Sequence, residues 1–290
     1  MTHDEVDATA TAMRSRNMAD STGSQSCSTC GGTSRASAGG SFVYALGRVE
    51  PRFPSLSVEK EFAQAVGRAQ TAKLADRQAI HAVLSQPEYA YLIRQLCWVF
   101  TIEGIDTYVV VPPGSEEARY LVEALRPSPR EGDVDVVLGT LGPPVGGRAC
   151  NGLMLPSVVL TQIYSFNVDE LIAKLPRPKE LGEAAFKATV SSVLQLAENP
   201  GLRSDHRAIN YLATRDASLY AAVAQRAQHK LSLASVDARP SALSTSREIK
   251  EVVLTFRHRE TDAADRLFAR VDTTELFPFL VSQLSPYTER

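Results

Sequence analysis

Four cysteines are the residues of this 290-residue sequence whose type and spacing point most directly to chemistry. Cys27 and Cys30 form a CxxC pair, in which two thiolates can bind one metal ion through a tight turn. Two glycines follow directly and permit the positive φ that such a turn needs. A structural zinc site takes four ligands, and Cys97 and Cys150 would complete it if the fold brings them to the pair. The sequence therefore predicts a candidate structural zinc site at Cys27, Cys30, Cys97 and Cys150.

Other roles for these cysteines stay open. Cys97 is predicted to lie in a helix, where a cysteine commonly serves as a small buried apolar side chain. The CxxC pair would then lie without a metal in a loose tail. A thioredoxin-like redox role is less favoured, because that CxxC must follow a strand and open a helix. A zinc-dependent enzyme with an open coordination position is the alternative from another functional class.

Residues 32–36, Gly-Thr-Ser-Arg-Ala, match the Gly-Thr-Ser-x-Ala motif around the nucleophile of subtilisin-like proteases. The proline expected two positions after the alanine is replaced by Ala38, and the match lies in low-complexity sequence. A serine nucleophile also needs a base and an orienting group. None of the histidines is followed by the Gly-Thr expected around a subtilase histidine; they are His3, His81, His206, His229 and His258. No catalytic set is visible, so the sequence leans against an enzyme.

Other polar clusters have structural explanations that are favoured over functional ones. Arg48, Glu50 and Arg52 follow one strand and could form an anionic-ligand or peptide-carboxylate site, but a surface ion-pair set is favoured. Asp205 opens a helix, where a carboxylate interacts favourably with the helix dipole. His81 is expected to be a partly buried structural histidine. Pro143 and Pro144 lie among the glycines of 139–147 and lack the N–H groups that a phosphate cradle would use.

Composition excludes several functional classes. The chain carries 31 basic and 33 acidic residues, so no basic excess exists to follow a nucleic-acid backbone. No apolar stretch is long enough for a transmembrane helix, and the N-terminus has no apolar signal-peptide core. We therefore expect a cytoplasmic protein that binds neither nucleic acid nor membrane. Cysteines in such a compartment argue against a disulfide framework.

Residues 1–40 are mostly Ser, Thr, Gly and Ala, and the first aromatic residue is Phe42. Such a segment cannot bury enough apolar surface to offset its ordering entropy, so it is expected to be a disordered tail. Its CxxC would be an exception if that pair binds metal. Pro176, Arg177 and Pro178 are the favoured boundary between two following units, 41–176 and 177–290.

Hydrophobic periodicity predicts the elements of both units. In the first unit, strands are expected at 42–49, 107–111 and 134–138, a further apolar segment at 158–164, and helices at 57–66, 76–85, 91–100, 116–125 and 169–175. In the second unit, helices are expected at 184–197 and after Ser204 and Asp216, followed by a β-hairpin of 252–257 and 267–272. Helices and strands are grouped rather than alternating. The predicted fold class is α+β, as two consecutive mixed modules.

Several segments carry a family resemblance. They are Phe42 to Arg48, Arg94 to Trp98, Cys150 to Met154 and, near the end, Arg270 to Glu275 followed by Phe277 to Leu280. These segments resemble the domain of unknown function at the C-termini of the cyanobactin maturation proteases PatA and PatG. The resemblance extends over about residues 41–290, as two modules that meet near Pro176.

In those proteases the domain follows a subtilisin-like catalytic domain, whereas here only the tail precedes it. The resemblance therefore implies a stand-alone accessory domain linked to the maturation of ribosomally synthesised, post-translationally modified peptides. A peptidase of the cyanobactin maturation type is a weaker alternative. The implied partner is a modifying enzyme or a precursor peptide, and self-association into a homo-oligomer stays open. Cys97 and Cys150 lie in the matching segments, which strengthens the prediction of a structural zinc site.

Overall fold

The computed structural model describes residues 41–68, 76–127, 132–261 and 263–288. These residues form one compact unit. The expected disordered tail, with Cys27 and Cys30, lies outside the described residues. The described part contains helices and two separate sheets, so the predicted α+β class is confirmed. The separation into domains at Pro176 stays a prediction.

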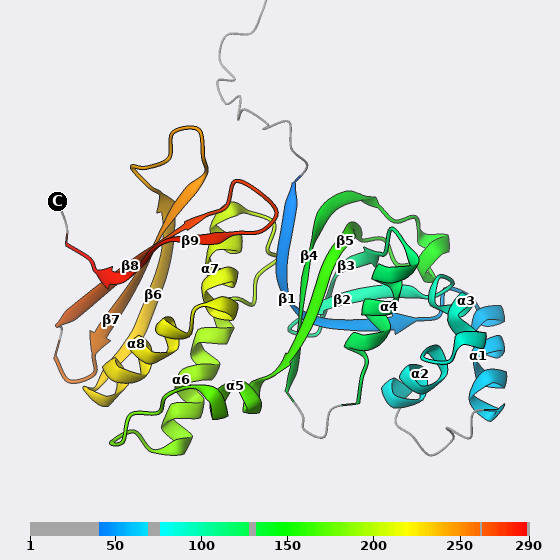
Figure 1. Cartoon of the computed structure of the whole chain (residues 1–290), viewed down its shortest axis with the longest axis horizontal. Helices are drawn as coiled ribbons and strands as arrows, with labels where there is room; N and C mark the ends of the chain where they lie inside the picture. Colours follow the sequence, from blue (N-terminus) through cyan, green and yellow to red (C-terminus); the bar gives the residue numbers. More distant parts are fainter. Residues whose placement is uncertain (1–40, 69–75, 128–131, 262, 289–290) are drawn as a thin grey trace, which may run out of the picture. The chain divides into compact units, whose positions relative to one another are not determined.

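The first sheet is a closed five-stranded barrel, at the right of Figure 1. Its strands are β1 (Phe42–Arg52), β2 (Cys97–Ile102), β3 (Ile105–Val111), β4 (Asp133–Pro144) and β5 (Pro156–Asn167). They are ordered β1-β2-β3-β5-β4, and all pair antiparallel except β3 with β5. Helix α4 (Ser115–Ala124) connects β3 to β4. This order, with its parallel closure and its helix after the third strand, is that of an OB-type barrel.

Strand β1 serves two neighbours because it changes partner halfway along. Its first part pairs with β4 and its second part pairs with β2. Gly47 lies at the change, where a Cβ would clash with the carbonyl oxygen of Thr101. A glycine is therefore required for the backbones of β1 and β2 to approach each other at this point.

The connection between β1 and β2 closes one end of the barrel. It contains α1 (Leu56–Arg68), α2 (Asp76–Leu84), a short 3-10 helix (Pro87–Tyr89) and α3 (Ala90–Ile93). Phe62, Val83 and Leu92 from this segment pack with Trp98 and Phe100 of β2 in the first core. The Trp98 indole N–H is buried and donates to the carbonyl oxygen of Ile93 at 2.9 Å, which satisfies its one donor.

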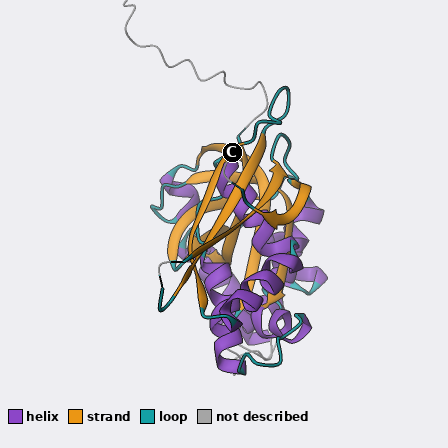
Figure 2. Ribbon diagram, turned by 90° about the vertical axis from the view of Figure 1, so that its left-hand side faces the viewer, coloured by secondary structure: helices purple, strands orange, loops and turns teal. Residues whose placement is uncertain are grey.

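The second half places helices against one face of a four-stranded antiparallel sheet. The helices are α5 (Val168–Lys174), α6 (Glu183–Gln195), α7 (Ser204–Arg215) and α8 (Ala217–Gln228). The strands, in spatial order, are β6 (Leu231–Pro240), β7 (Ile249–His258), β8 (Ala264–Asp272) and β9 (Phe279–Pro286). Figure 2 is turned so that this sheet faces the viewer. Val252, Leu254 and Phe256 alternate along β7 and face the helices in a second core.

The two halves are joined at Tyr44 of β1. Its N–H donates to Gly201 at 2.9 Å, and its carbonyl oxygen accepts from the buried Asn210 side chain at 2.7 Å. Asn210 also donates to the Asn199 side chain at 3.1 Å. The turn at 199–201 thereby lies against β1, and Gly201 adopts a φ of +66° directly against the Tyr44 backbone.

Most expected elements are confirmed, including the hairpin, in which Leu254 lies opposite Leu267. The helix expected over 91–100 is wrong beyond Ile93, because β2 begins at Cys97. All six residues of β2 are buried, so the strand has no alternation of buried and exposed residues that would distinguish it from a buried helix.

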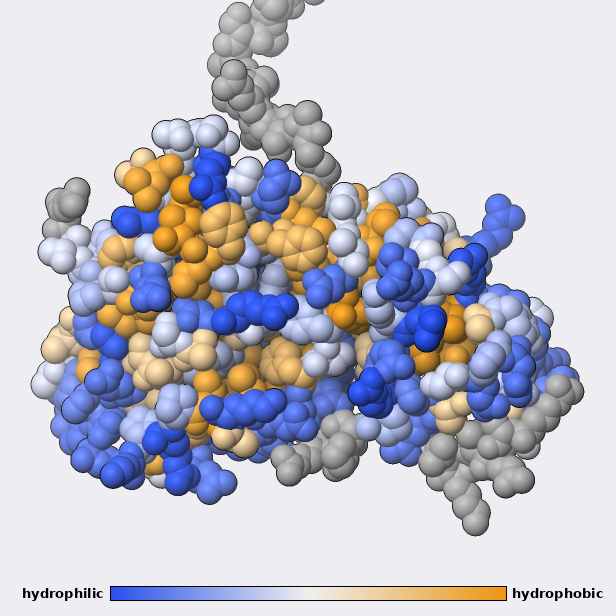
Figure 3. Space-filling model, in the orientation of Figure 1, coloured by the Kyte–Doolittle hydropathy of each residue, from blue (hydrophilic) through white to orange (hydrophobic). Residues whose placement is uncertain are grey.

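The terminal strands β6 and β9 were not predicted. Both lie at the edges of their sheet, and exposed apolar residues gather on or near β9, namely Phe277, Phe279 and Val281. Figure 3 shows apolar atoms gathered over this region.

Removing the contacts at Tyr44 should destabilise the whole described unit. Asn210→Ala leaves a buried carbonyl oxygen without its donor, and we expect a loss of about 1–3 kcal/mol in unfolding free energy. Gly201→Ala forces a Cβ into the Tyr44 backbone at a left-handed φ, and we expect a loss of about 2 kcal/mol or more. Urea unfolding measures both. The exposed helix residue Gln195 provides the control, and Gln195→Ala should change stability by less than about 0.5 kcal/mol. Equal effects at 195 and 210 would contradict this role.

Asp272 at the end of β8 should make stability depend on acid pH. Burial alone would raise the pKa of its carboxyl group, but hydrogen bonds from Thr274 and the charge of Arg247 outweigh burial and lower the pKa. A lowered pKa stabilises the fold above the ordinary pKa near 4, and this contribution is lost as the pH falls through the folded-state value. Asp272→Asn should therefore reduce stability at pH 7 and flatten the acid limb of the stability profile. Asp237→Asn, at an exposed position of the same sheet, should leave that limb unchanged.

Candidate functional site

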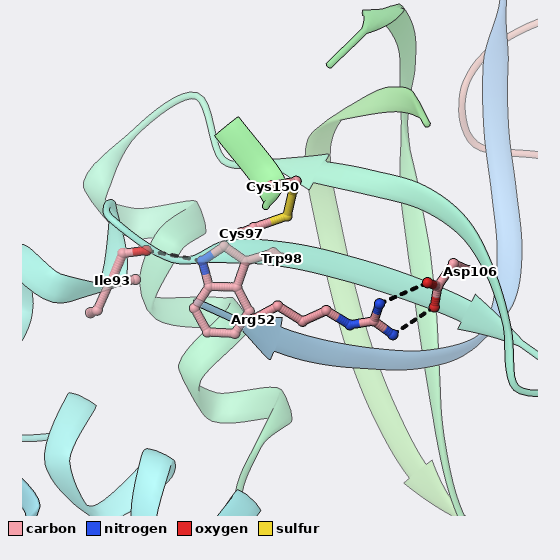
Figure 4. The surroundings of a disulfide bond; sticks show 6 residues. All are labelled: Arg52, Ile93, Cys97, Trp98, Asp106 and Cys150. Carbon is pink, nitrogen blue, oxygen red and sulfur yellow. Dashed lines mark hydrogen bonds and ion pairs between the residues drawn. A yellow bond between two sulfur atoms is a disulfide. The ribbon is translucent and has the colours of Figure 1, made fainter. Parts of the chain in front are cut away.

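The structure brings Cys97 and Cys150 together as a disulfide, with a Cα–Cα distance of 5.4 Å (Figure 4). Cys97 is the first residue of β2, and Cys150 ends a short 3-10 turn (Gly147–Cys150) in the connection between β4 and β5. The expectation from composition that the chain holds no structural disulfide is therefore wrong for this pair. Two residues that are 53 positions apart in sequence become neighbours only when the barrel closes.

The disulfide bears on the zinc prediction without deciding it. A metal is bound by thiolates, and neither sulfur of a disulfide is a thiolate. A four-cysteine zinc site would therefore need Cys97 and Cys150 in the reduced form, together with Cys27 and Cys30 from outside the described residues. Within the ranges that the structure describes, no group of three or more His, Cys, Asp or Glu side chains could hold a metal ion. The zinc site stays a prediction.

The disulfide fastens residues 145–155 onto the outer face of β2 and β3. Val99 and Val109 from this face form a small apolar cluster with the two cysteines. Three residues of the 145–155 loop pack against the cluster: Val145, Leu153 and Leu155. The chain can reverse within this loop because Asn151 and Gly152 both adopt positive φ, at 50° and 90°. The loop thus covers part of a barrel face that would otherwise be open.

A cleft of about 600 Å³ lies beside this loop. Its walls come from four places: the start and end of the β1–β2 connection, the beginning of β2, the end of β3 and the disulfide-bearing loop. In OB-type barrels, the face of strands 2 and 3 and the loops after strands 1 and 4 form the ligand site. The cleft therefore lies where the topology of the barrel predicts a binding site. Its lining residues are Pro54, Ser55, Ile93–Trp98, Val109–Pro113, Val145 and Arg148–Cys150.

The charged residues of this lining are both cations. Arg94 donates to the Ser115 hydroxyl at 2.7 Å, and Arg148 is exposed. In the part of the chain that the structure describes, neither arginine forms an ion pair with a carboxylate, and no carboxylate lines the cleft. The rest of the lining is mainly aliphatic or proline. The cleft can therefore hold an apolar group that carries a negative charge.

The aromatic residues of β2 and β3 do not take part in this surface as stacking platforms. Trp98, Phe100 and Tyr108 are buried in the first core. Binding of single-stranded nucleic acid to an OB barrel relies on exposed aromatic rings and a basic groove. The aliphatic floor of this cleft, formed largely by β-branched residues, instead suits the side chains of a peptide.

The remaining predicted polar residues have structural partners. Arg52 binds Asp106 through two hydrogen bonds, at 2.7 and 2.6 Å (Figure 4). It also contacts Glu50. Arg48 donates to the carbonyl oxygen of Asp133 at 3.2 Å. The ion-pair interpretation is thus confirmed for Arg52 and Glu50, whereas Arg48 bonds a backbone carbonyl. Burial lowers the pKa of His81, which is half-buried in α2 beside Ser85.

Sequence reasoning did not single out Arg94 or Arg148 as site residues. Arg94 stands in the segment before Cys97 that carried the family resemblance, and Arg148 lies two positions before Cys150. No regular spacing connects them, because one belongs to the β1–β2 connection and the other to the β4–β5 loop. Their closeness to Cys97 and Cys150 in the sequence is the one signal that could have drawn attention to them. In the described ranges, no helix is long and apolar enough to cross a membrane.

Reduction of the disulfide should destabilise the protein. The bond closes a loop of 53 residues, for which chain entropy gives a contribution of about 2–4 kcal/mol. A reducing agent should lower the unfolding free energy by this amount in the wild type and leave the double variant Cys97→Ser/Cys150→Ser unaffected. Urea unfolding with and without dithiothreitol measures the difference. Elemental analysis of the reduced protein distinguishes a disulfide from a zinc site. Stoichiometric zinc in the wild type that is lost in the double variant would favour zinc ligation by Cys97 and Cys150.

Comparison with known proteins gives a consistent result. A family model described as PatG Domain matches residues 42–197, and a second described as PatG C-terminal matches residues 178–287. A solved structure titled "PatG Domain of Unknown Function" is similar, with a TM-score of 0.68 and 20% sequence identity. The match covers 86% of this chain and 99% of that chain. No curated protein matches the sequence. The structural similarity, at this identity, bears on the fold alone.

Proposed function

The chain belongs to the PatG domain family, and on that premise we propose that it is a non-catalytic accessory protein that recognises a partner during the maturation of ribosomally synthesised, post-translationally modified peptides. The partner is a precursor peptide or one of the enzymes that modify it, and the encounter takes place in the cytoplasm. The link to cyanobactin-type maturation rests on the family resemblance. The solved relative is itself titled a domain of unknown function, so it lends no activity to this proposal.

The cleft beside the disulfide is the observation that carries the proposal. It lies on the ligand face of an OB-type barrel, and it combines an aliphatic lining with two arginines that have no carboxylate partner in the described chain. Concave apolar sites with a few convergent polar groups are the usual form of binding sites. A recognition role needs such a surface and needs no nucleophile or general base.

Filling the cleft should weaken partner binding. Ala149 is exposed in the loop that forms one wall, so Ala149→Trp places a large side chain there. The tagged chain is immobilised and exposed to the precursor peptide and the modifying enzymes encoded by neighbouring genes. We expect one of them to be retained by the wild type and its binding to weaken at least roughly tenfold in Ala149→Trp, about 1.4 kcal/mol.

Ala263→Trp is the matched control, because Ala263 is exposed in the turn between β7 and β8 in the other half of the chain. It should bind like the wild type. Retention of no candidate partner would contradict the recognition function. Retention that is equal for Ala149→Trp and the wild type would keep a recognition function but move it away from the cleft.

A further inference from the structure

We propose that the cleft beside the disulfide binds the C-terminal end of a linear apolar peptide, whose terminal carboxylate is bound by Arg94 and Arg148. This inference rests on the proposed function and adds a ligand chemistry to it. It concerns a feature of the peptide, a free carboxylate, that chemical modification of the C-terminus would remove.

The charges of the cleft lead to this ligand. An arginine side chain has five N–H donors in a planar fork that matches a carboxylate. Arg94 uses a donor on the neutral Ser115 hydroxyl, and the Arg148 side chain has no hydrogen-bond or ion-pair partner among the described residues. Arg52 shows the contrast, since its guanidinium binds the carboxylate of Asp106 through two hydrogen bonds. The chain therefore pairs the nearby Arg52 with a carboxylate, whereas the two exposed arginines at the cleft have no carboxylate partner among the described residues.

Prolines at the rim limit what the backbone around the cleft can contribute to an anion site. Pro54, Pro112 and Pro113 line the rim, and proline has no N–H to donate. An anion-binding nest of successive backbone N–H groups is thus blocked at these positions. Recognition of the negative group falls to the two arginines, which come from different connections and can approach a carboxylate from separate directions.

The apolar lining defines the rest of the ligand. Leu96, Val109, Val111 and Val145 contribute aliphatic surface, and the cleft volume of about 600 Å³ lies within the usual range of roughly 300–1,000 Å³ for small-ligand sites. A few aliphatic residues preceding a carboxylate match this combination of lining and charge. A nucleotide is a poorer match, because the aromatic rings of β2 and β3 face the core.

The test uses the full chain and labelled peptide pools. Linear tetrapeptides randomised over Val, Leu, Ile and Pro carry fluorescein at the N-terminus and either a free acid or an amide at the C-terminus. Fluorescence anisotropy measures binding to the wild type, to Arg94→Gln/Arg148→Gln and to Arg257→Gln, an exposed arginine of the second sheet as control. We expect the wild type and the control to bind the acid pool at least roughly tenfold more tightly than the amide pool, a preference of the size that charge-assisted hydrogen bonds provide.

The double arginine variant should lose this preference and bind both pools like the wild type binds the amide. Ala149→Trp should bind neither pool. Equal binding of acid and amide by the wild type, abolished by Ala149→Trp, would overturn the carboxylate inference while supporting peptide recognition in the cleft. Displacement of the acid pool by decanoate as effectively as by unlabelled peptide would overturn the peptide as the ligand. If neither pool binds but a partner encoded by a neighbouring gene is retained, only this inference fails; if nothing is retained, the proposed function fails with it.

Discussion

The burial of β1 on both faces is the constraint on which the rest of the structure depends. Val43 and Ala45 point into the barrel, whereas Tyr44 and Leu46 contribute to the core that the helices of the second half build. One strand therefore belongs to two cores, and its backbone at Tyr44 is further bound by Gly201 and Asn210. Burial also raises the pKa of the Tyr44 phenol, which keeps it protonated and hydrogen-bonded to Tyr164. The barrel cannot loosen here without opening the second core.

Because β1 packs against both cores, its position determines which outer surface of the barrel is free for binding. The outer faces of β1 and β4 are covered by the second half, since Leu46, Val136 and Leu138 pack with its helices. The outer face of β2 and β3 has no such cover and is closed only in part, by the loop at 145–155. The cleft lies at the border of that cover. The second half leaves β2 and β3 exposed, and a binding site can therefore form on their outer face. The OB-type strand order places the loops after β1 and β4 beside that face, where they can form the walls of the site.

The sequence allowed the helices and the hairpin to be predicted because each has its own periodicity. The β-branched and aromatic content of β1 also predicted a strand, and the structure shows that it is buried between two cores. Cys97 to Ile102 was misassigned because a fully buried strand lacks alternation. The barrel itself was beyond local reasoning, since closure depends on the parallel pairing of β3 with β5, which only the long-range register reveals. Arg94 and Arg148 both line the cleft because of that same closure, so no regular spacing in the sequence could predict that they share a site.

The cysteine pair connects the site to the redox state of its surroundings. Disulfides persist in oxidising compartments, whereas a reducing cytoplasm keeps thiols free. With the bond open, the loop would be held on β2 and β3 by its apolar contacts and by its own hydrogen bonds, such as Val145 N–H to Leu155 at 2.9 Å. Those bonds preserve the shape of the loop but do not tie it to β2. The wall that carries Arg148 and Ala149 would then depend on the burial of a few aliphatic side chains, while Arg94 would stay fixed beside Trp98. The relative position of the two arginines is therefore the feature of the cleft that is most sensitive to the loss of the disulfide. An anionic ligand that binds both arginines would help to hold the loop in place.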